Sequence, residues 1–182
     1  MMNYTYAMVD VKDEVFNILR AELPKHGFVD VKVLKSDPQT PAELPCVGIN
    51  RISDEETNQT INDGVGTTYN KDTKEYTIIK GTFFSEAVEI RVWHTHADQR
   101  DILYRTVKAI LFAYRQELVN KGLINISLRG GRDEQDTTMA HAPMVLYWGT
   151  ITMSYLNPLN VEIVEIADII TDFTDVGGIS NL

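Results

Sequence analysis

Hydrophobic and polar residues alternate along several segments of this chain. Between residues 86 and 93, Val88, Ile90 and Val92 fall on one face of an extended chain, while charged residues fall on the other. A two-residue period of this kind predicts a half-buried β-strand. Strands are likewise predicted over residues 29–34, 46–52, 76–84, 123–128 and 144–156.

Two other segments carry apolar residues at intervals of three and four and therefore predict amphipathic helices. The first runs from Asp10 to Leu23, and the second begins at about Asp98 and closes at Gly122. Asp10 and Asp98 are placed to accept hydrogen bonds from the unpaired amides of the first turn. Gly122 stands where a left-handed residue often ends a helix. The buried stripe of the second helix is expected to comprise Leu103, Val107, Ile110, Leu111, Tyr114 and Leu118.

These elements predict an α+β fold, with a mostly antiparallel sheet and two helices packed on one of its faces. Residues 1–156 suit a single domain with one core. Residues 53–80 begin with a run rich in Asn, Thr, Asp and Gly, which predicts a loop or long hairpin protruding from the core. Residues 157–182 follow as a C-terminal arm.

The C-terminal arm differs in composition from the rest of the chain. It holds five acidic residues and no lysine or arginine, so it carries −5 of the net charge of −9. Its start alternates acidic and apolar residues, namely Glu162, Ile163, Glu165 and Ile166. The arm either adds one more strand to the same sheet or binds a neighbouring molecule as a strand or a short helix.

The overall charge and hydropathy exclude two classes of partner. No cluster of lysine and arginine is large enough to neutralise a run of phosphates, which argues against sequence-specific nucleic-acid binding. No apolar run approaches the roughly 20 residues that a membrane-spanning helix needs, and the amino terminus does not resemble a signal peptide. We expect a protein made in a cytoplasm, with Cys46 as a buried structural thiol.

The segment from His94 to Asp98 is the strongest candidate for a metal site. His94 and His96 follow an apolar strand and lie on one side of it, which is the arrangement that two metal ligands need. The segment resembles the opening of the metallo-β-lactamase motif, but Gln99 stands where that motif has another histidine. We expect the pair to end the strand at the sheet edge, with a metal site completed by Asp98 and His141 as the alternative.

Two more features suggest contacts with other molecules. Arg129, Arg132 and Asp133 surround two glycines, but no helix follows that could form a phosphate loop. This segment is either a solvated loop or a charge-paired contact with another subunit. Trp93 and Trp148 lie on the strand faces opposite the predicted core. They are either covered by the first helix or mark an interface, where tryptophan is enriched.

The sequence contains no arrangement that predicts catalysis. A nucleophile motif such as Gly-x-Ser-x-Gly is absent, which argues against an acyl-transfer enzyme. We therefore expect no enzymatic activity and no cofactor.

The order and texture of three segments resemble a known family. The segments 87–93, 98–103 and 122–126, read together with the rest of residues 10–156, are similar to the neck and tail proteins of tailed bacteriophages, above all to the tail terminators. This resemblance implies a structural virion protein that assembles in the host cytoplasm as a ring, commonly a hexamer. Such a ring stops growth of the tail tube and docks it to the head-side connector, with a sheath as a further partner and DNA only passing through the lumen.

Three alternatives accompany this interpretation. The chain could be another neck or head–tail adaptor protein. It could be a regulatory or adaptor module that binds another protein through exposed tryptophans without forming a ring. It could also be a metal-binding protein that uses His94 and His96.

Overall fold

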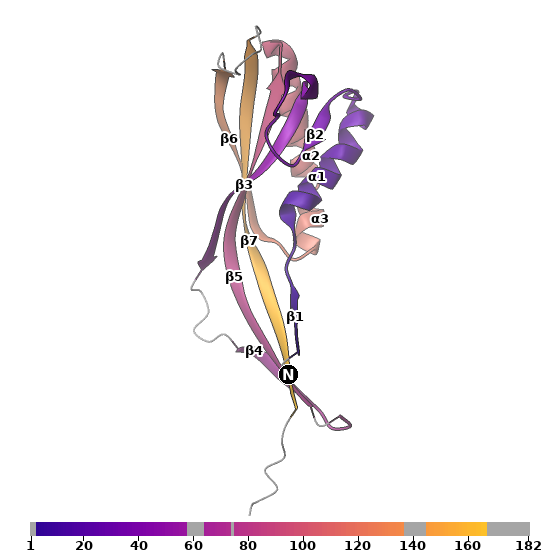
Figure 1. The fold of residues 1–182 in the computed structure, drawn as a ribbon, viewed down its shortest axis with the longest axis vertical. Coiled ribbons are helices and arrows are strands. Elements are labelled where there is room, and N and C mark those ends of the chain that lie inside the picture. Colours follow the sequence, from indigo (N-terminus) through magenta and orange to yellow (C-terminus); the bar gives the residue numbers. More distant parts are fainter. Residues whose placement is uncertain (1–2, 58–63, 74, 137–144, 167–182) are drawn as a thin grey trace, which may run out of the picture.

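The computed structural model describes residues 3–57, 64–73, 75–136 and 145–166, and it has the predicted α+β architecture (Figure 1). Two long strands, β5 (Glu75–His94) and β7 (Leu146–Ile166), form its centre. They pair antiparallel along their whole length without a register shift. The other elements are β1 (Asn3–Ala7), α1 (Val11–Glu22), η1 (Leu23–His26), β2 (Lys32–Leu34), η2 (Pro41–Glu43), β3 (Cys46–Thr57), β4 (Gly64–Asn70), α2 (Ala97–Ala113), α3 (Arg115–Asn120) and β6 (Ile124–Asp136).

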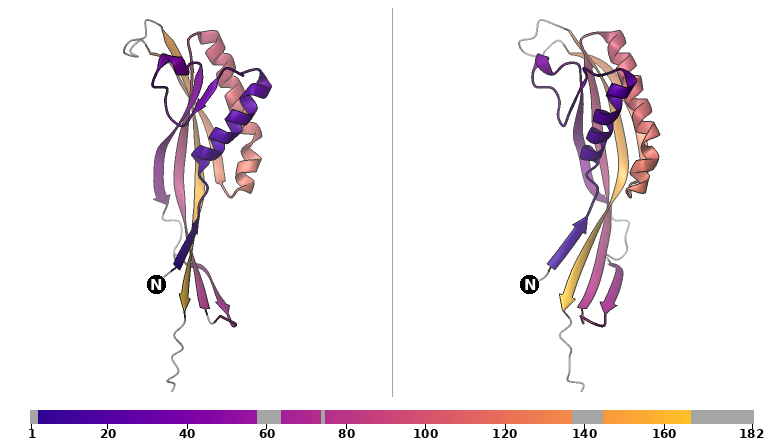
Figure 2. Two further views of the ribbon diagram at one scale, coloured as in Figure 1. Left: turned by 45° about the vertical axis from the view of Figure 1, so that its right-hand side comes forward. Right: turned by 90° about the vertical axis from the view of Figure 1, so that its right-hand side faces the viewer.

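The sheet has two halves that differ in how they are covered. In one half the strand order is β6-β7-β5-β3-β2, and α1, α2 and α3 lie beside one face (Figures 1 and 2). In the other half the order is β1-β7-β5-β4, and the helices do not extend beside it. We call this second half the ribbon and define it as residues 3–7, 64–70, 75–83 and 157–166. All pairs are antiparallel except β2 with β3.

On each side of the central pair, one outer strand is replaced by another at nearly the same position along β5 and β7. On one side β3 ends opposite Phe83 and β4 begins opposite Lys80. On the other side β6 begins at Ile124, opposite Leu156, and β1 ends at Ala7, opposite Asn160. Within the described residues the sheet is therefore only two strands wide at Thr82 and Leu159, beside Pro158, and we call this place the waist. A proline has no N–H to donate, and it is tolerated there because one side of β7 has no neighbouring strand.

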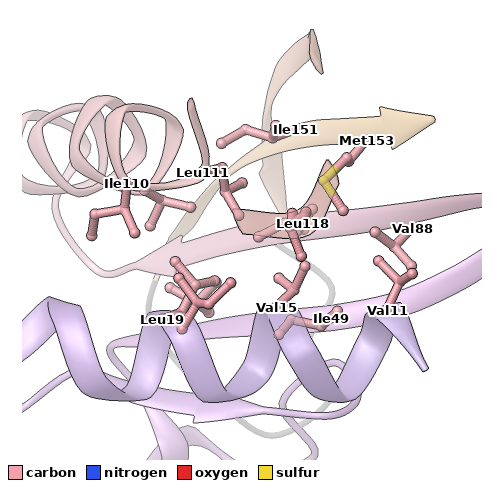
Figure 3. Close-up of a cluster of buried hydrophobic side chains, with 14 of the residues drawn as sticks. Val11, Val15, Leu19, Ile49, Val88, Ile110, Leu111, Leu118, Ile151 and Met153 are labelled. Atoms are coloured by element: carbon pink, nitrogen blue, oxygen red, sulfur yellow. The ribbon is translucent and has the colours of Figure 1, made fainter. Parts of the chain in front are cut away.

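A single hydrophobic core fills the space between the helices and the covered half of the sheet (Figure 3). The helical stripes predicted from the sequence supply it, with Val15 and Leu19 of α1 facing Leu111 of α2. Val88 and Ile90 of β5 are fully buried beneath them, which confirms the face assigned to that strand. The core is thus built from residues that the periodicity alone identifies.

The two predicted helix caps have different outcomes. The side chain of Asp10 accepts a hydrogen bond from the backbone N–H of Asp13 at 3.2 Å, as predicted. The capping role predicted for Asp98 is wrong, because His96 is the N-cap residue and Asp98 lies in the first turn of α2. There its negative charge still interacts favourably with the positive end of the helix dipole.

The second predicted helix is divided in two at Tyr114. This residue ends α2 and precedes α3, and its hydroxyl donates a 2.7 Å hydrogen bond to Glu22 of α1. The predicted end of the helical region is correct, because Gly122 has a left-handed backbone with φ of 108°. The chain then turns directly into β6.

Several strands differ in length from the prediction. The segment predicted over 29–34 is reduced to β2, and β1 was not predicted. The protrusion expected at 53–80 consists of the end of β3, all of β4 and the start of β5, so in its described part it is mostly sheet. β7 continues ten residues past the predicted domain boundary at 156. None of the helices in the described ranges is long and apolar enough to cross a membrane.

Two adjacent residues of α2 provide a stability test. Leu111 is 1 % exposed and Phe112 is 68 % exposed. We expect Leu111→Ala to lower the free energy of unfolding by about 2–5 kcal/mol, because it leaves a cavity in the core. Phe112→Ala removes a larger side chain but should change the free energy of unfolding by less than about 0.5 kcal/mol, because Phe112 is exposed. Urea denaturation followed by circular dichroism measures both, and equal losses would contradict the assigned helix faces.

Candidate interaction surfaces

The two tryptophans lie side by side on the sheet face opposite the helices. Trp93 and Trp148 are register partners on β5 and β7, and their rings stack with centroids 5.5 Å apart. Because Val92 points into the core, alternation places Trp93 on the outer face, as predicted. Trp93 is 6 % exposed and Trp148 is half-buried. The suggestion that the first helix covers them is wrong, because α1 packs on the other face.

An ionic network lies beside the tryptophans on the same face. Arg91 forms ion pairs with Asp37 and, at 2.6 Å, with Glu89. Its guanidinium carbon is also 5.4 Å from the ring centroid of Trp148. Asp37 in turn accepts a 3.0 Å hydrogen bond from the side chain of Asn50. These contacts fix the loop before η2 across the outer face of β3 and β5.

The loop crosses β3 at Gly48. A Cβ atom built on this glycine would lie 2.7 Å from the carbonyl oxygen of Ser36 and 3.2 Å from a carboxylate oxygen of Asp37. A side chain here would push the loop away from the sheet. Cys46, on the same face of β3, is fully buried, and burial raises the pKa of its thiol to about 12, which confirms the predicted structural role.

A glycine pair tests this close approach. Gly48→Ala should lower the free energy of unfolding by about 1–3 kcal/mol, because the added methyl group meets backbone that cannot move freely. The matched control is Gly66→Ala on β4, where nothing lies within 4 Å of the added carbon. That variant should be neutral or slightly stabilising. Thermal unfolding measures both, and a neutral Gly48→Ala would show that the loop is not held against the strand.

The segment containing Arg129, Arg132 and Asp133 is not a loop. It belongs to β6, and the strand pairing shifts between Gly130 and Asp133 as in a β-bulge. Arg129 is exposed, and the side chains of the other two lie outside the described ones. A Cβ on Gly130 would lie 2.7 Å from the hydroxyl oxygen of Tyr104. Because the two glycines have no side chains, Tyr104 of α2 and Thr150 of β7 can lie close to this strand.

The predicted interface residues of the arm belong to the ribbon. Ile163 pairs with Ile78 of β5 and with Tyr4 of β1, and Glu162 is exposed beside it. Residues 157–166 continue β7, so this part of the arm belongs to the same sheet, which is one of the two predicted alternatives. Glu165 and Ile166 also lie in β7, but their side chains are outside the described ones. Residues 167–182 lie outside the described residues.

The predicted residues therefore form two groups at opposite ends of β7. Trp93, Trp148 and the bulged part of β6 lie at its beginning, whereas Glu162, Ile163, Glu165 and Ile166 lie at its end. Any contact that used both groups would involve two different surfaces of the molecule.

The histidines end β5 and begin α2. His94 is the last residue of the strand, and its Nδ1 accepts a 3.0 Å hydrogen bond from the backbone N–H of His96. Burial and the neighbouring His96 lower the pKa of His94. Among the described residues no group of three or more His, Cys, Asp or Glu side chains is placed to hold a metal ion. His141 lies outside these residues.

A buried polar cluster marks the junction of the covered half with the ribbon. Glu86 is 1 % exposed and accepts hydrogen bonds from Tyr155 at 2.7 Å and from Asn157 at 3.4 Å. Asn157 also donates to the carbonyl oxygen of Val9 at 2.8 Å, which ties the chain before α1 to the sheet. Burial, and to a smaller extent the hydrogen bond to Glu86, raises the pKa of Tyr155 well above its ordinary value. The hydroxyl group of Tyr155 therefore keeps its proton and remains a hydrogen-bond donor.

This cluster was not predicted from the sequence. The two-residue spacing places Glu86 on the same face of β5 as the buried Val88 and Ile90, and this position could have indicated a buried carboxylate. A carboxylate on a core face requires partners, because an unpaired buried charge is unfavourable.

The cluster supports a test with two tyrosines. Tyr155→Phe removes the stronger donor to a buried carboxylate and should lower the free energy of unfolding by about 1–3 kcal/mol. Tyr76→Phe, at a ribbon tyrosine that is 42 % exposed, is the control and should have little effect. Urea unfolding at neutral pH compares them. Equal stability of the two variants would mean that Glu86 does not depend on Tyr155.

The ribbon exposes apolar side chains on both of its faces. Along β5, Ile78 points to one face, while Ile79 and Phe83 point to the other, and all three are half-buried. The half-buried Leu159 and Val161 of β7 line a hollow with Glu56 and Lys80. The rings of Tyr69 and Tyr76 are in contact near the tip, with centroids 4.6 Å apart and planes tilted by 33°. A sheet with apolar side chains on both faces normally has a layer on each of them.

Comparisons with models of protein families and with curated proteins found no match to this sequence. Arguments about function therefore rest on the residues and on the fold.

Proposed function

We propose that this protein is a ring-forming structural component of the neck of a tailed bacteriophage, acting as the terminator that caps the tail tube and docks it to the head-side connector. The proposal rests on the resemblance in element order and on one observation, the uncovered ribbon that extends from a two-layer unit. Its partners are further copies of the chain, the tube protein, the connector and, where one exists, the sheath.

The ribbon supports a role in assembly because of what it leaves exposed. Each of its faces presents apolar residues to solvent, as the pairs Ile78–Ile163 and Phe83–Pro158 illustrate. Patches of this kind are usually covered by another protein. In a ring each subunit joins two neighbours through two different surfaces, and a protruding ribbon with a compact unit at its base provides such a pair of surfaces.

The charge of the chain suits a channel through which DNA passes. The net charge is −9, and acidic walls repel phosphates and so limit sticking. Tight binding to DNA would instead need a positively charged channel. The acidic balance therefore agrees with a protein that surrounds DNA without holding it.

The first test is the mass of the purified protein. Light scattering over a concentration series should give a discrete ring mass, and negative-stain electron microscopy should reveal closed rings. The double variant Ile78→Glu/Ile163→Glu places charges at a paired apolar position of the ribbon and should weaken association at least tenfold. The control Val29→Glu alters an apolar residue that is 71 % exposed at the other end of the molecule, and it should assemble normally.

A second measurement tests the place of the protein in a particle. Gold-labelled antibody should mark the junction of head and tail, and particles assembled without the protein should have tail tubes of irregular length. A protein that stays monomeric at every concentration and is absent from particles would refute the proposal. A monomer that nevertheless marks the junction would show that the ring forms only on its partner.

A further inference from the structure

The outer side of α2 carries a groove that combines cations with apolar surface. Ala109 and Phe112 of α2 and Leu128 of β6 line its apolar part, and Phe112 is 68 % exposed. Arg105, Lys108 and Arg115 surround these residues.

The three cations have no acidic partner within the described residues. The ion pairs found there involve other lysines and arginines, such as Lys121 with Glu14 and Arg51 with Asp54. Acidic residues outnumber basic ones by 26 to 17 in this chain, so three neighbouring cations without an acidic partner among the described residues are unexpected. An exposed phenylalanine beside them marks a surface suited to an acidic, apolar ligand.

The chain contains one segment with the complementary pattern. Residues 168–176 read Asp-Ile-Ile-Thr-Asp-Phe-Thr-Asp-Val, and the chain has no lysine or arginine beyond Arg132. In helical spacing, Asp168, Asp172 and Asp175 form one stripe, and the apolar residues Ile169, Phe173 and Val176 form an adjacent one. Three acids beside three apolar residues match the three cations beside Ala109, Phe112 and Leu128.

The length of the chain places this segment on another molecule. Leu128 in the groove is paired with Met153, and β7 continues 13 residues from there to Ile166. At about 3.3 Å per residue this is roughly 40 Å along the strand. β7 ends at the far tip of the ribbon from α2 (Figure 1). Even fully extended, the chain from Ile166 to Asp172 spans no more than about 22 Å, so the acidic stripe cannot reach the groove of its own molecule.

We propose that residues 168–176 of one copy dock in the groove of α2 on a second copy, with their aspartates facing Arg105, Lys108 and Arg115 and their apolar residues against Phe112. The inference rests on the proposed function only in requiring several copies side by side. It assigns one specific contact between them, from the tip of one ribbon to the helix layer of its neighbour.

A labelled peptide tests the contact directly. A fluorescent peptide of residues 167–182 is titrated with the full-length protein, diluted until light scattering gives a monomer, so that the groove is free of neighbouring chains. Fluorescence anisotropy should show saturable binding that weakens as salt is added. Lys108→Glu should weaken binding at least tenfold, and so should Phe112→Ala. The control Arg20→Glu reverses an exposed cation on α1 and should leave binding unchanged.

A second peptide separates the contribution of the aspartate charges from that of the apolar residues. The same peptide with Asp168, Asp172 and Asp175 changed to asparagine keeps its apolar residues and should bind at least tenfold more weakly. Equal binding of the two peptides, or binding that Lys108→Glu and Phe112→Ala leave unchanged, would overturn the inference.

A cross-link establishes which copy supplies the segment. Ala109→Cys is introduced in a tagged protein and Phe173→Cys in an untagged one, and the mixture is oxidised. The native Cys46 is fully buried and does not interfere. Mixed dimers should form, whereas a double variant that cross-links only within one molecule would overturn the assignment to a neighbour. If the peptide binds but antibody does not mark the head–tail junction, the proposed function fails and the docking stands. The reverse result would reject the docking alone.

Discussion

The unbroken pairing of β5 with β7 is the constraint on which the rest of the structure depends. The ladder runs from Glu75 opposite Ile166 to His94 opposite Tyr147, and every other strand except β2 joins one of these two. A slip of one residue between β5 and β7 would exchange the two faces of the strand that moves. A slip of β7 would move Ile151 and Met153 out of the core and place Trp148 against the helices. A slip of β5 would do the same to Val88, Ile90 and Arg91. Both the core and the outer tryptophan face therefore require this one register.

The same ladder serves two different environments. Where the helices cover it, burial of apolar residues stabilises the pairing, and Glu86 with Tyr155 and Asn157 closes the end of that region. Beyond them the strands continue without a second layer. A sheet that loses its covering layer but keeps its apolar residues retains surface for association. The buried polar cluster thus separates the part of the molecule that is complete alone from the part that is suited to contact with others.

The sequence predicted what depends on periodicity and missed what depends on contacts between distant segments. The core faces of β5, α1 and α2, the cap at Asp10 and the turn at Gly122 were all predictable, because each is signalled within a few residues. Gly130 and Gly131 suggested a loop, whereas here they allow close approach to Tyr104 and Thr150. The change in charge after residue 156 suggested the end of a domain, yet β7 continues through Pro158, because the proline lies where one neighbouring strand has ended. The cluster at Glu86 needed Val9 and Asn157, which no local pattern connects to it.

The waist gives the molecule a mechanical property. Two-stranded sheets twist more readily than wide ones, because fewer neighbours oppose rotation of one strand about the other. In the described residues the sheet narrows to β5 and β7 alone at Thr82 and Leu159, between a helix-backed sheet and a four-stranded ribbon. Torsion is therefore concentrated at this place, and the ribbon can rotate about the long axis of the molecule while both of its ends keep their internal packing. A change in this one angle would reorient the ribbon relative to the helix layer without refolding either end.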